Sequence, residues 1–424
     1  MTTTHQRNAI AASLLLFGSA AQADVELSFL VTGTSDTVKQ TKALTEAYVA
    51  MRPDVSFDLE QRPGGAEGDN IVKTRLATGE MADIFYYNSG SLFQALRPTR
   101  TLADLSDLEA QENVLESFKS VVRADDKLYG VPYEPAMGGG IFYNKPLYAE
   151  LGLSVPTTWD EFMANNAKVK EAGRVAVAQT YGTTWTSQLF VLADFFNVQA
   201  EVPDFAERYT ANEAKFADTP AAMRGFEYLE QLHAGGYFNE DFGAARYDDG
   251  LRMVASGEAA HYPMLTFAIP AIEQNHPELL EDVGFFAQPG PDAASNGLTV
   301  WMPGALYIPK SSENVEEAKA FLEFVASAEG CAVVSAAVAV TGPYVIRDCE
   351  LPEEVPGAVS DMLPYFETEG TTAPALEFLS PVKGPSLEQI TVEAGSGMRP
   401  GAEAAALYDG DVAKQAKQLG LPNW

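Results

Sequence analysis

The 424-residue chain has little cysteine, histidine or basic charge, and each shortage excludes a class of function. It carries two cysteines and four histidines. It contains no His-Glu-x-x-His, Cys-x-x-Cys or Gly-x-Ser-x-Gly pattern, so no zinc or nucleophile motif stands out. Against 59 Asp and Glu there are 28 Lys and Arg, which gives a formal net charge of −31. An acidic surface repels nucleic acid and anionic lipid, so we exclude both as partners and interpret the charge as a solvating shell.

Long hydrophobic runs are also lacking, apart from one near the N-terminus. The apolar run from Ala9 to Ala21 ends in the small-residue pattern Ala21-Gln22-Ala23, which predicts a signal peptide over residues 1–23 and a mature chain that begins near Asp24. No cysteine follows this run, which disfavours a lipid anchor. The apolar stretch from Cys331 to Val340 is too short to span a membrane. We therefore expect an exported, soluble periplasmic protein without membrane insertion.

The chain is long for a single core, and its first part alternates between strand and helix patterns. Apolar residues predict strands over 25–31, 55–59 and 82–87, separated by helices over 37–51 and around 71–76, the second ending at Gly79. This order indicates a parallel sheet covered by helices. Ligands bind outside the carboxyl ends of strands in such sheets, so we expect them at loops 33–36, 62–68 and 87–91.

One stretch carries a set of motifs at close spacing. It contains Tyr129-Gly130-Val131-Pro132, a Gly-rich bend at Gly138 to Gly140, Tyr143-Asn144-Lys145, a short helix stopped by Gly152, and Thr158-Trp159-Asp160-Glu161. Thr158 and Glu161 form a capping-box pattern at the start of a helix. In order and spacing the set resembles the extracellular solute-binding proteins of ABC importers, in particular their carbohydrate-binding, maltose-binding-protein-like group.

The resemblance covers most of the chain from Val25 to about Gly342, and the last 80 or so residues resemble the family only loosely. It includes the segment from Met253 to Ala271, although His261 stands where many members have Met. It implies an α/β fold with two lobes, each a mainly parallel sheet flanked by helices, and a ligand cleft between them. We expect the N-terminal lobe to comprise 24–135 and 304–342, and the C-terminal lobe 136–303 and 343–424. The chain then crosses near 134–137, 300–304 and 342–343.

Carbohydrate binding needs flat aromatic faces for the sugar ring and planar polar groups for its hydroxyls. The resemblance implies that an aromatic residue follows the strand over 82–87, and Tyr87 falls there, unless it only packs the strand end. Trp185 and Phe267 match positions of aromatic residues that often face the cleft, with packing roles as the alternative. Trp301 lies beside the second crossing. We expect Trp159, in contrast, to be part of the core.

The polar candidates lie in the same predicted loops. Asn88 and Ser89 follow Tyr87, and Glu134 lies near the first crossing, where it either accepts sugar hydroxyls or forms a surface salt bridge. Asp36 either helps to cap its helix or reaches the ligand. Arg62 and Arg347 are the basic residues nearest to predicted cleft loops, and if both point inward they indicate an anionic ligand.

The two cysteines, Cys331 and Cys349, form an even pair in an exported chain, so we expect a disulfide rather than two buried thiols.

The sequence therefore predicts a binding protein, without cofactor or metal, that captures a mono- or oligosaccharide by hinge closure and delivers it, as a monomer, to an ABC permease. One alternative keeps the fold but binds an anionic or other polar solute such as a glycerol phosphate. Another is a secreted carbohydrate-active enzyme, because a catalytic carboxylate pair could hide among the many acidic residues.

Overall fold

The structure is a computed structural model that describes residues 1–2 and 25–424. Apart from its first two residues, the expected signal peptide lies outside the described residues. Within them, no single helix is long and apolar enough to cross a membrane. Two successive helices over Val315–Val325 and Ala328–Ala337 reach that length and composition only when taken together, and they are bent by 70°.

Strands form two sheets and one short hairpin. They are β1 (Val25–Thr32), β2 (Val55–Arg62), β3 (Ile84–Tyr87), β4 (Arg123–Ala124), β5 (Lys127–Leu128), β6 (Gly130–Pro132), β7 (Met137–Asn144), β8 (Val175–Val177), β9 (Ala259–Leu265), β10 (Val283–Ala287), β11 (Leu298–Trp301), β12 (Ala305–Tyr307) and β13 (Thr372–Pro374).

Helices surround both sheets. They are α1 (Ser35–Met51), α2 (Gly65–Thr78), α3 (Ser91–Ala95), α4 (Pro98–Thr101), α5 (Glu116–Lys119), α6 (Lys145–Leu151), α7 (Trp159–Glu171), α8 (Leu189–Leu192), α9 (Phe195–Glu201), α10 (Phe205–Thr210), α11 (Pro220–Ala234), α12 (Tyr247–Ser256), α13 (Ile269–Asn275), α14 (Val315–Val325), α15 (Ala328–Ala337), α16 (Gly357–Glu367), α17 (Leu376–Leu379), α18 (Leu387–Gly395) and α19 (Gly401–Leu419).

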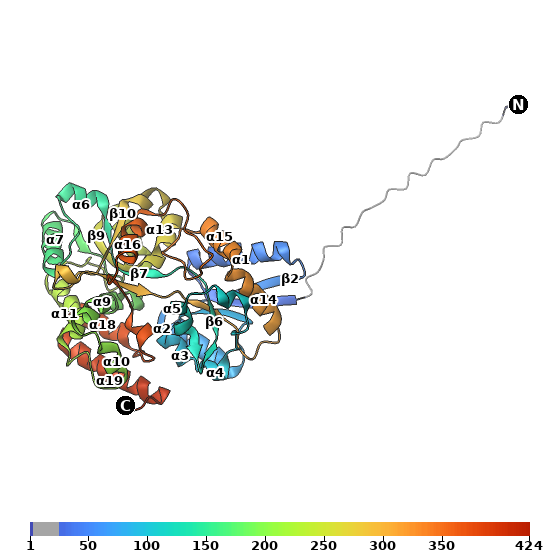
Figure 1. Cartoon of the computed structure of the whole chain (residues 1–424). Helices are drawn as coiled ribbons and strands as arrows, with labels where there is room; N and C mark the ends of the chain where they lie inside the picture. Colours follow the sequence, from blue (N-terminus) through green and yellow to red (C-terminus); the bar gives the residue numbers. More distant parts are fainter. Residues whose placement is uncertain (3–24) are drawn as a thin grey trace.

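The first sheet has the strand order β2-β1-β3-β12-β6. Its first three strands are parallel, as the alternation of strand and helix predicts, whereas β12 runs antiparallel to both β3 and β6. Apolar side chains of β1 such as Leu27 and Phe29 are fully buried beneath α1 and α14. Figure 1 shows this sheet on the right with α1, α2, α14 and α15 around it.

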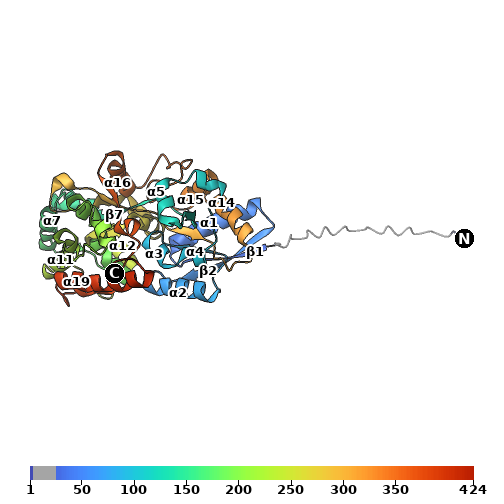
Figure 2. The same cartoon turned by 60° about the horizontal axis from the view of Figure 1, so that its bottom comes forward.

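The second sheet has the order β13-β11-β7-β9-β8, with β10 also paired to β7. Strand β7 is antiparallel to β9, β10 and β11, so this sheet is mixed, and a mainly parallel second sheet is not what the chain forms. In Figures 1 and 2 this half lies on the left, with α7, α11 and α19 on its outer side.

Local sequence signals set several helix boundaries. Thr158 and Glu161 form both hydrogen bonds of the predicted capping box at the start of α7, and Gly152 and Gly79 end α6 and α2 in the left-handed conformation. Trp159 is 5% exposed, and its ring stacks on that of Tyr228 with the centroids 3.5 Å apart, which confirms its structural role. Gly138 to Gly140, however, lie inside β7 and do not form a bend.

The chain passes between the sheets at three places. It leaves the first sheet at Pro132 and enters the second at Met137, and it returns between Trp301 and Ala305. The segment after Gly342 still belongs to the first half, because Leu115 N donates to Val345 O and Arg347 N donates to Asn113 O. The third passage therefore lies after Cys349, later than the 342–343 expected from the sequence.

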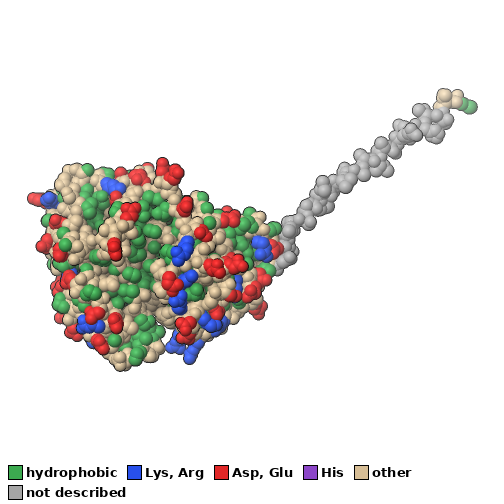
Figure 3. Space-filling view, viewed as in Figure 1, with side chains coloured by type: hydrophobic (Ala, Val, Ile, Leu, Met, Phe, Trp, Pro, Cys, Tyr) green, Lys and Arg blue, Asp and Glu red, His purple; other side chains and the backbone are tan. Residues whose placement is uncertain are grey.

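A disulfide joins Cys331 of α15 to Cys349, with the Cα atoms 5.9 Å apart, which is the pairing expected from the sequence. It fastens the end of the segment over 343–349 to the first half of the molecule. Acidic side chains spread over both halves on the face seen in Figure 3, which agrees with a solvating shell rather than one acidic patch.

Candidate functional site

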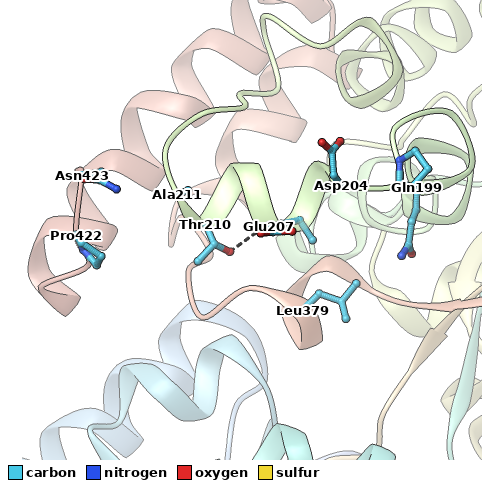
Figure 4. Close-up of a pocket in the computed structure, with 10 residues that line it drawn as sticks. Gln199, Asp204, Glu207, Thr210, Ala211, Leu379, Pro422 and Asn423 are labelled. Atoms are coloured by element: carbon cyan, nitrogen blue, oxygen red, sulfur yellow. Dashed lines mark hydrogen bonds between the residues drawn. The ribbon is translucent and has the colours of Figure 1, made fainter.

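Two hollows that are each large enough for a small molecule differ in what lines them. One, of about 570 Å³, lies on the outside of the second half, where α9, α10 and α17 meet the C-terminal residues Pro422 and Asn423 (Figure 4). The other, of about 360 Å³, is lined by both halves of the molecule. A two-lobed fold can enclose a ligand only in the second, which we therefore take as the candidate site.

The wall from the first half is polar. It is built at the carboxyl ends of β1, β2 and β3, where parallel strands leave their loops at one edge of the sheet. The side chains and backbone there include Thr32, Thr34, Thr37, Arg62, Asp69, Asn70, Lys73, Tyr86, Asn88, Ser89, Ser91 and Glu134. Ser89 is held in place because its Oγ donates to Pro303 O at 2.8 Å.

Arg62 is committed to the protein rather than free to bind an anion. It is 4% exposed, its Nη1 and Nη2 donate to Pro63 O and Tyr86 O, and its guanidinium lies 5.5 Å from the ring centroid of Tyr87. Burial lowers the pKa of Arg62. Its Nε, like Ser91 Oγ, is buried without a hydrogen-bond partner among the described residues.

The wall from the second half combines aromatic and apolar side chains with several polar and charged ones. Trp185, Phe267, Trp301 and Phe378 line it together with Met137, Leu189, Leu192 and Leu265. Trp185 lies in a 3₁₀ turn, η3 (Thr184–Gln188), and its ring centroid is 5.8 Å from that of Phe267. These two rings form the first aromatic group of the wall.

Trp301 forms the other aromatic group, and its orientation is fixed from two sides. Its Nε1 donates to Glu377 Oε1 at 2.7 Å, and the second oxygen of Glu377 pairs with Lys383 Nζ at 2.8 Å. Its ring lies against Gly139 of β7, where any side chain would collide with it. The indole is thus held with its polar edge satisfied, and it is only 6% exposed because it also packs with Met137, Ala193 and Ala375.

Glu134 lies at the first passage between the halves and is partly buried. Tyr86 Oη donates to its Oε1 at 2.8 Å and Gly304 N at 3.3 Å. Burial raises the pKa of Glu134 to about 7, and the two hydrogen bonds only partly offset this effect. The carboxyl therefore changes its charge near neutral pH, and it is not part of a surface salt bridge.

The structure brings together seven of the ten residues that the sequence proposed for ligand contact. Asn88, Ser89, Glu134, Trp185, Phe267, Trp301 and Arg62 all line the cavity between the halves. Tyr87 does not, because it is fully buried on the opposite side of β3, and its neighbour Tyr86 takes the place on the wall. Asp36 lines only a separate small hollow next to Glu134, with its Oδ1 buried.

Arg347 lies furthest from the expectation. It is exposed, and its backbone N pairs with Asn113 O on the first half, so the side chain is not part of the cavity wall. We expected Arg347 at the cleft because it follows the predicted third passage near 342–343. The structure places that passage after Cys349.

Sequence reasoning missed the part of the wall that comes from the last 80 residues. Glu377, Phe378, Lys383, Leu387, Glu388 and Gln415 all line the cavity. The charges there are mixed, since Lys383 pairs with Glu377, and burial raises the pKa of Glu388. The prolines and the glycine between Pro381 and Pro385 do predict a loop in this region, but nothing in that pattern indicates that the loop lies at a cleft. No group of His, Cys, Asp and Glu fit to hold a metal ion occurs in residues 1–2 and 25–424.

Comparison with known proteins supports this picture of the fold. The chain is 28% identical over 295 residues, 68% of each chain, to the "Multiple sugar-binding protein" of Streptococcus mutans. It superposes on a solved chitin oligosaccharide binding protein with a TM-score of 0.80 at 20% identity, over 92% of this chain and 99% of that one. A solved structure of RafE in complex with raffinose gives 0.75 at 20% identity, over 93% and 99%. The family model of the bacterial extracellular solute-binding proteins matches residues 34–330, and the chain belongs to that family.

Proposed function

We propose that the protein captures a carbohydrate in the cavity between its two lobes and delivers it to the permease of an ABC importer. The observation that carries the proposal is that Trp185, Phe267, Trp301 and Phe378 come from one lobe, whereas most of the hydroxyl and amide side chains of the cavity come from the other. A pyranose has the same division, because its C–H faces are apolar and its edge carries hydroxyls. The name of the Streptococcus relative and the raffinose bound by RafE support the same ligand class.

Ligand contact with both lobes would favour the closed arrangement by the difference in contacts between open and closed forms. We take the first lobe as 24–135 with 304–349 and the second as 136–303 with 350–424, because residues 343–349 hydrogen-bond to the first lobe. The ligand would leave unchanged, because the cavity serves here for binding and not for catalysis. We further propose export through residues 1–23 to the periplasm, where the protein acts as a monomer.

An anionic ligand is less well supported by the wall. The two Nη atoms of Arg62 bond to carbonyl groups, Lys383 pairs with Glu377, and Arg347 lies outside the cavity. A phosphate or carboxylate would have to break an interaction of Arg62 or Lys383, or bind through Lys73, which lines the cavity near the Asp69 carboxyl.

Calorimetry with a panel of neutral mono- and oligosaccharides tests the proposal. We expect binding with a dissociation constant in the micromolar range or tighter, and recovery of the sugar unchanged by chromatography. If only phosphorylated or carboxylated solutes bind, the ligand is anionic and not a neutral sugar. If a hydrolysis product is released, the protein is an enzyme and not a binding protein.

A further inference from the structure

The first turn of α2 lies at the cavity, and it begins without a capping side chain. Its N-cap residue is Gly64, which has no side chain that could accept a hydrogen bond from the N–H groups of the first turn. The helix is 14 residues long, so these N–H groups form the positive end of a substantial dipole. An uncapped helix end of this kind is stabilised by an anion placed against it.

The anion that lies there comes from the other lobe. Glu388, in the first turn of α18, places its two carboxylate oxygens 3.5 and 3.6 Å from the position that a Cβ on Gly65 would occupy. Gly65 is the first residue of α2, and the backbone N–H of Ala66 lowers the pKa of the Glu388 carboxyl against the larger raising effect of burial. The carboxylate thus lies against the first turn of α2 from across the cleft.

Glu388 is held in this position by its own lobe. Thr184 Oγ1 donates to Glu388 Oε2 at 2.7 Å. Ser187 Oγ donates to the carbonyl of Glu388 at 3.0 Å and lies 2.7 Å from Thr391 Oγ1, so η3 and the first turns of α18 are fastened together. The carboxylate is therefore preorganised on the second lobe, and it reaches the helix end only when the lobes are together.

We propose that Glu388 is a positioning residue that caps α2 in trans and so favours closure of the lobes around the ligand. The inference rests on the proposed capture by closure and adds the residue that sets the closed-to-open ratio. In an open arrangement the carboxylate moves away, and the first-turn N–H groups of α2 hydrogen-bond to water instead. The same carboxylate lines the cavity beside Trp185, so a ligand that extends past this indole must displace it.

The test measures lobe separation in the protein without any sugar. The described chain has no free cysteine, so nitroxide labels on Lys42→Cys in α1 and Lys168→Cys in α7, both exposed, report one distance across the lobes by pulsed electron resonance. We expect Glu388→Ala to lower the closed-to-open ratio by about twofold to thirtyfold, the range that loss of a helix cap gives. Glu393→Ala on the same helix, whose carboxylate pairs with Arg399 in its own lobe, should leave the ratio unchanged.

A second variant separates capping from packing. Gly64→Ser supplies α2 with a cap of its own in both arrangements, and a Cβ there would come no closer than 4.0 Å to Trp185 Nε1. This variant should lower the closed-to-open ratio while it raises the melting temperature, an effect that a merely structural Glu388 would not produce. It also keeps the test informative if Glu388→Ala does not fold.

An unchanged ratio in Gly64→Ser, or a ratio lowered equally by Glu393→Ala and Glu388→Ala, would overturn the inference. Neither result depends on which solute binds. The calorimetry therefore tests the proposed sugar ligand, and the distance measurements test the capping role independently. With a bound sugar in hand, its affinity should fall in Glu388→Ala by the factor found for the closed-to-open ratio.

Discussion

A Cβ on Gly139 would lie 2.1 Å from Cζ3 of Trp301, so the indole occupies the space that a side chain at position 139 of β7 would need. Gly139→Ala should therefore push the ring out of its position, break its bond to Glu377, and weaken ligand binding by about tenfold or more, together with a loss of stability of about 1–3 kcal/mol. Calorimetry and urea unfolding measure the two effects.

The matched control is Gly410→Ala. Gly410 lies in α19, is exposed, and has open space around the position of a Cβ, so this substitution should stabilise the protein by about 0.5–1 kcal/mol without a change in binding. If Gly139→Ala behaved like Gly410→Ala, the close packing of Trp301 on β7 would not matter for the site.

Trp185 and Trp301 are expected to contribute separately to binding, because they belong to different aromatic groups of the wall. Trp185→Ala and Trp301→Ala should each weaken binding of the sugar by about tenfold to a hundredfold, from lost apolar contact. Trp159→Ala serves as the control, since its ring stacks in the core on Tyr228 and its loss should lower stability but not the affinity of the folded fraction. Equal affinity of both cavity variants and the parent would remove the stacking role.

Glu134 should make the protein more stable in mild acid than at alkaline pH. Its pKa is about 7 in the folded protein, against an ordinary value of 4.5 that applies to the unfolded chain, so the folded state binds the proton more tightly. The stabilisation is fully present below about pH 4.5 and is lost as the pH rises through about 7. Glu134→Gln mimics the protonated group, so it should exceed the parent's stability by less than about 1 kcal/mol at pH 5 and by about 3 kcal/mol at pH 8.

Urea unfolding of both proteins from pH 5 to pH 8 gives this difference directly. Other buried carboxyls, such as Asp194 with a pKa of about 7, titrate in both proteins and cancel. A difference that does not grow with pH would show that Glu134 is already ionised in the folded state at pH 5.

The disulfide should stabilise the protein by restricting the unfolded chain. Cys331 and Cys349 are separated by 18 positions, and closing a loop of that length contributes about 3 kcal/mol. The double variant Cys331→Ser, Cys349→Ser should unfold at a correspondingly lower urea concentration. Reduction of the parent with dithiothreitol should give the same shift and should leave the variant unaffected.

Most of the fold could be predicted from the sequence because its signals are local. The apolar periodicity of α11, the capping box of α7 and the left-handed Gly152 each act within a few residues. The choice between Tyr86 and Tyr87 could not be predicted, because neighbouring residues of a strand point to opposite faces and the sequence does not say which face meets the cleft. The bend predicted at Gly138 to Gly140 was wrong for a similar reason. Glycine is required there because side chains from distant segments pack closely against the strand, and not because the chain turns.

The wall of the cavity also depends on a part of the chain that family resemblance does not reach. The match to the family ends at residue 330, whereas Glu377, Phe378, Lys383 and Glu388 come after it. A change confined to the C-terminal segment can therefore alter the cavity wall without a change in the first sheet, although the same segment contributes Leu387, Ile390 and Tyr408 to the core of the second half. Chimaeras that trade only this segment are the direct route to a binding protein of altered selectivity.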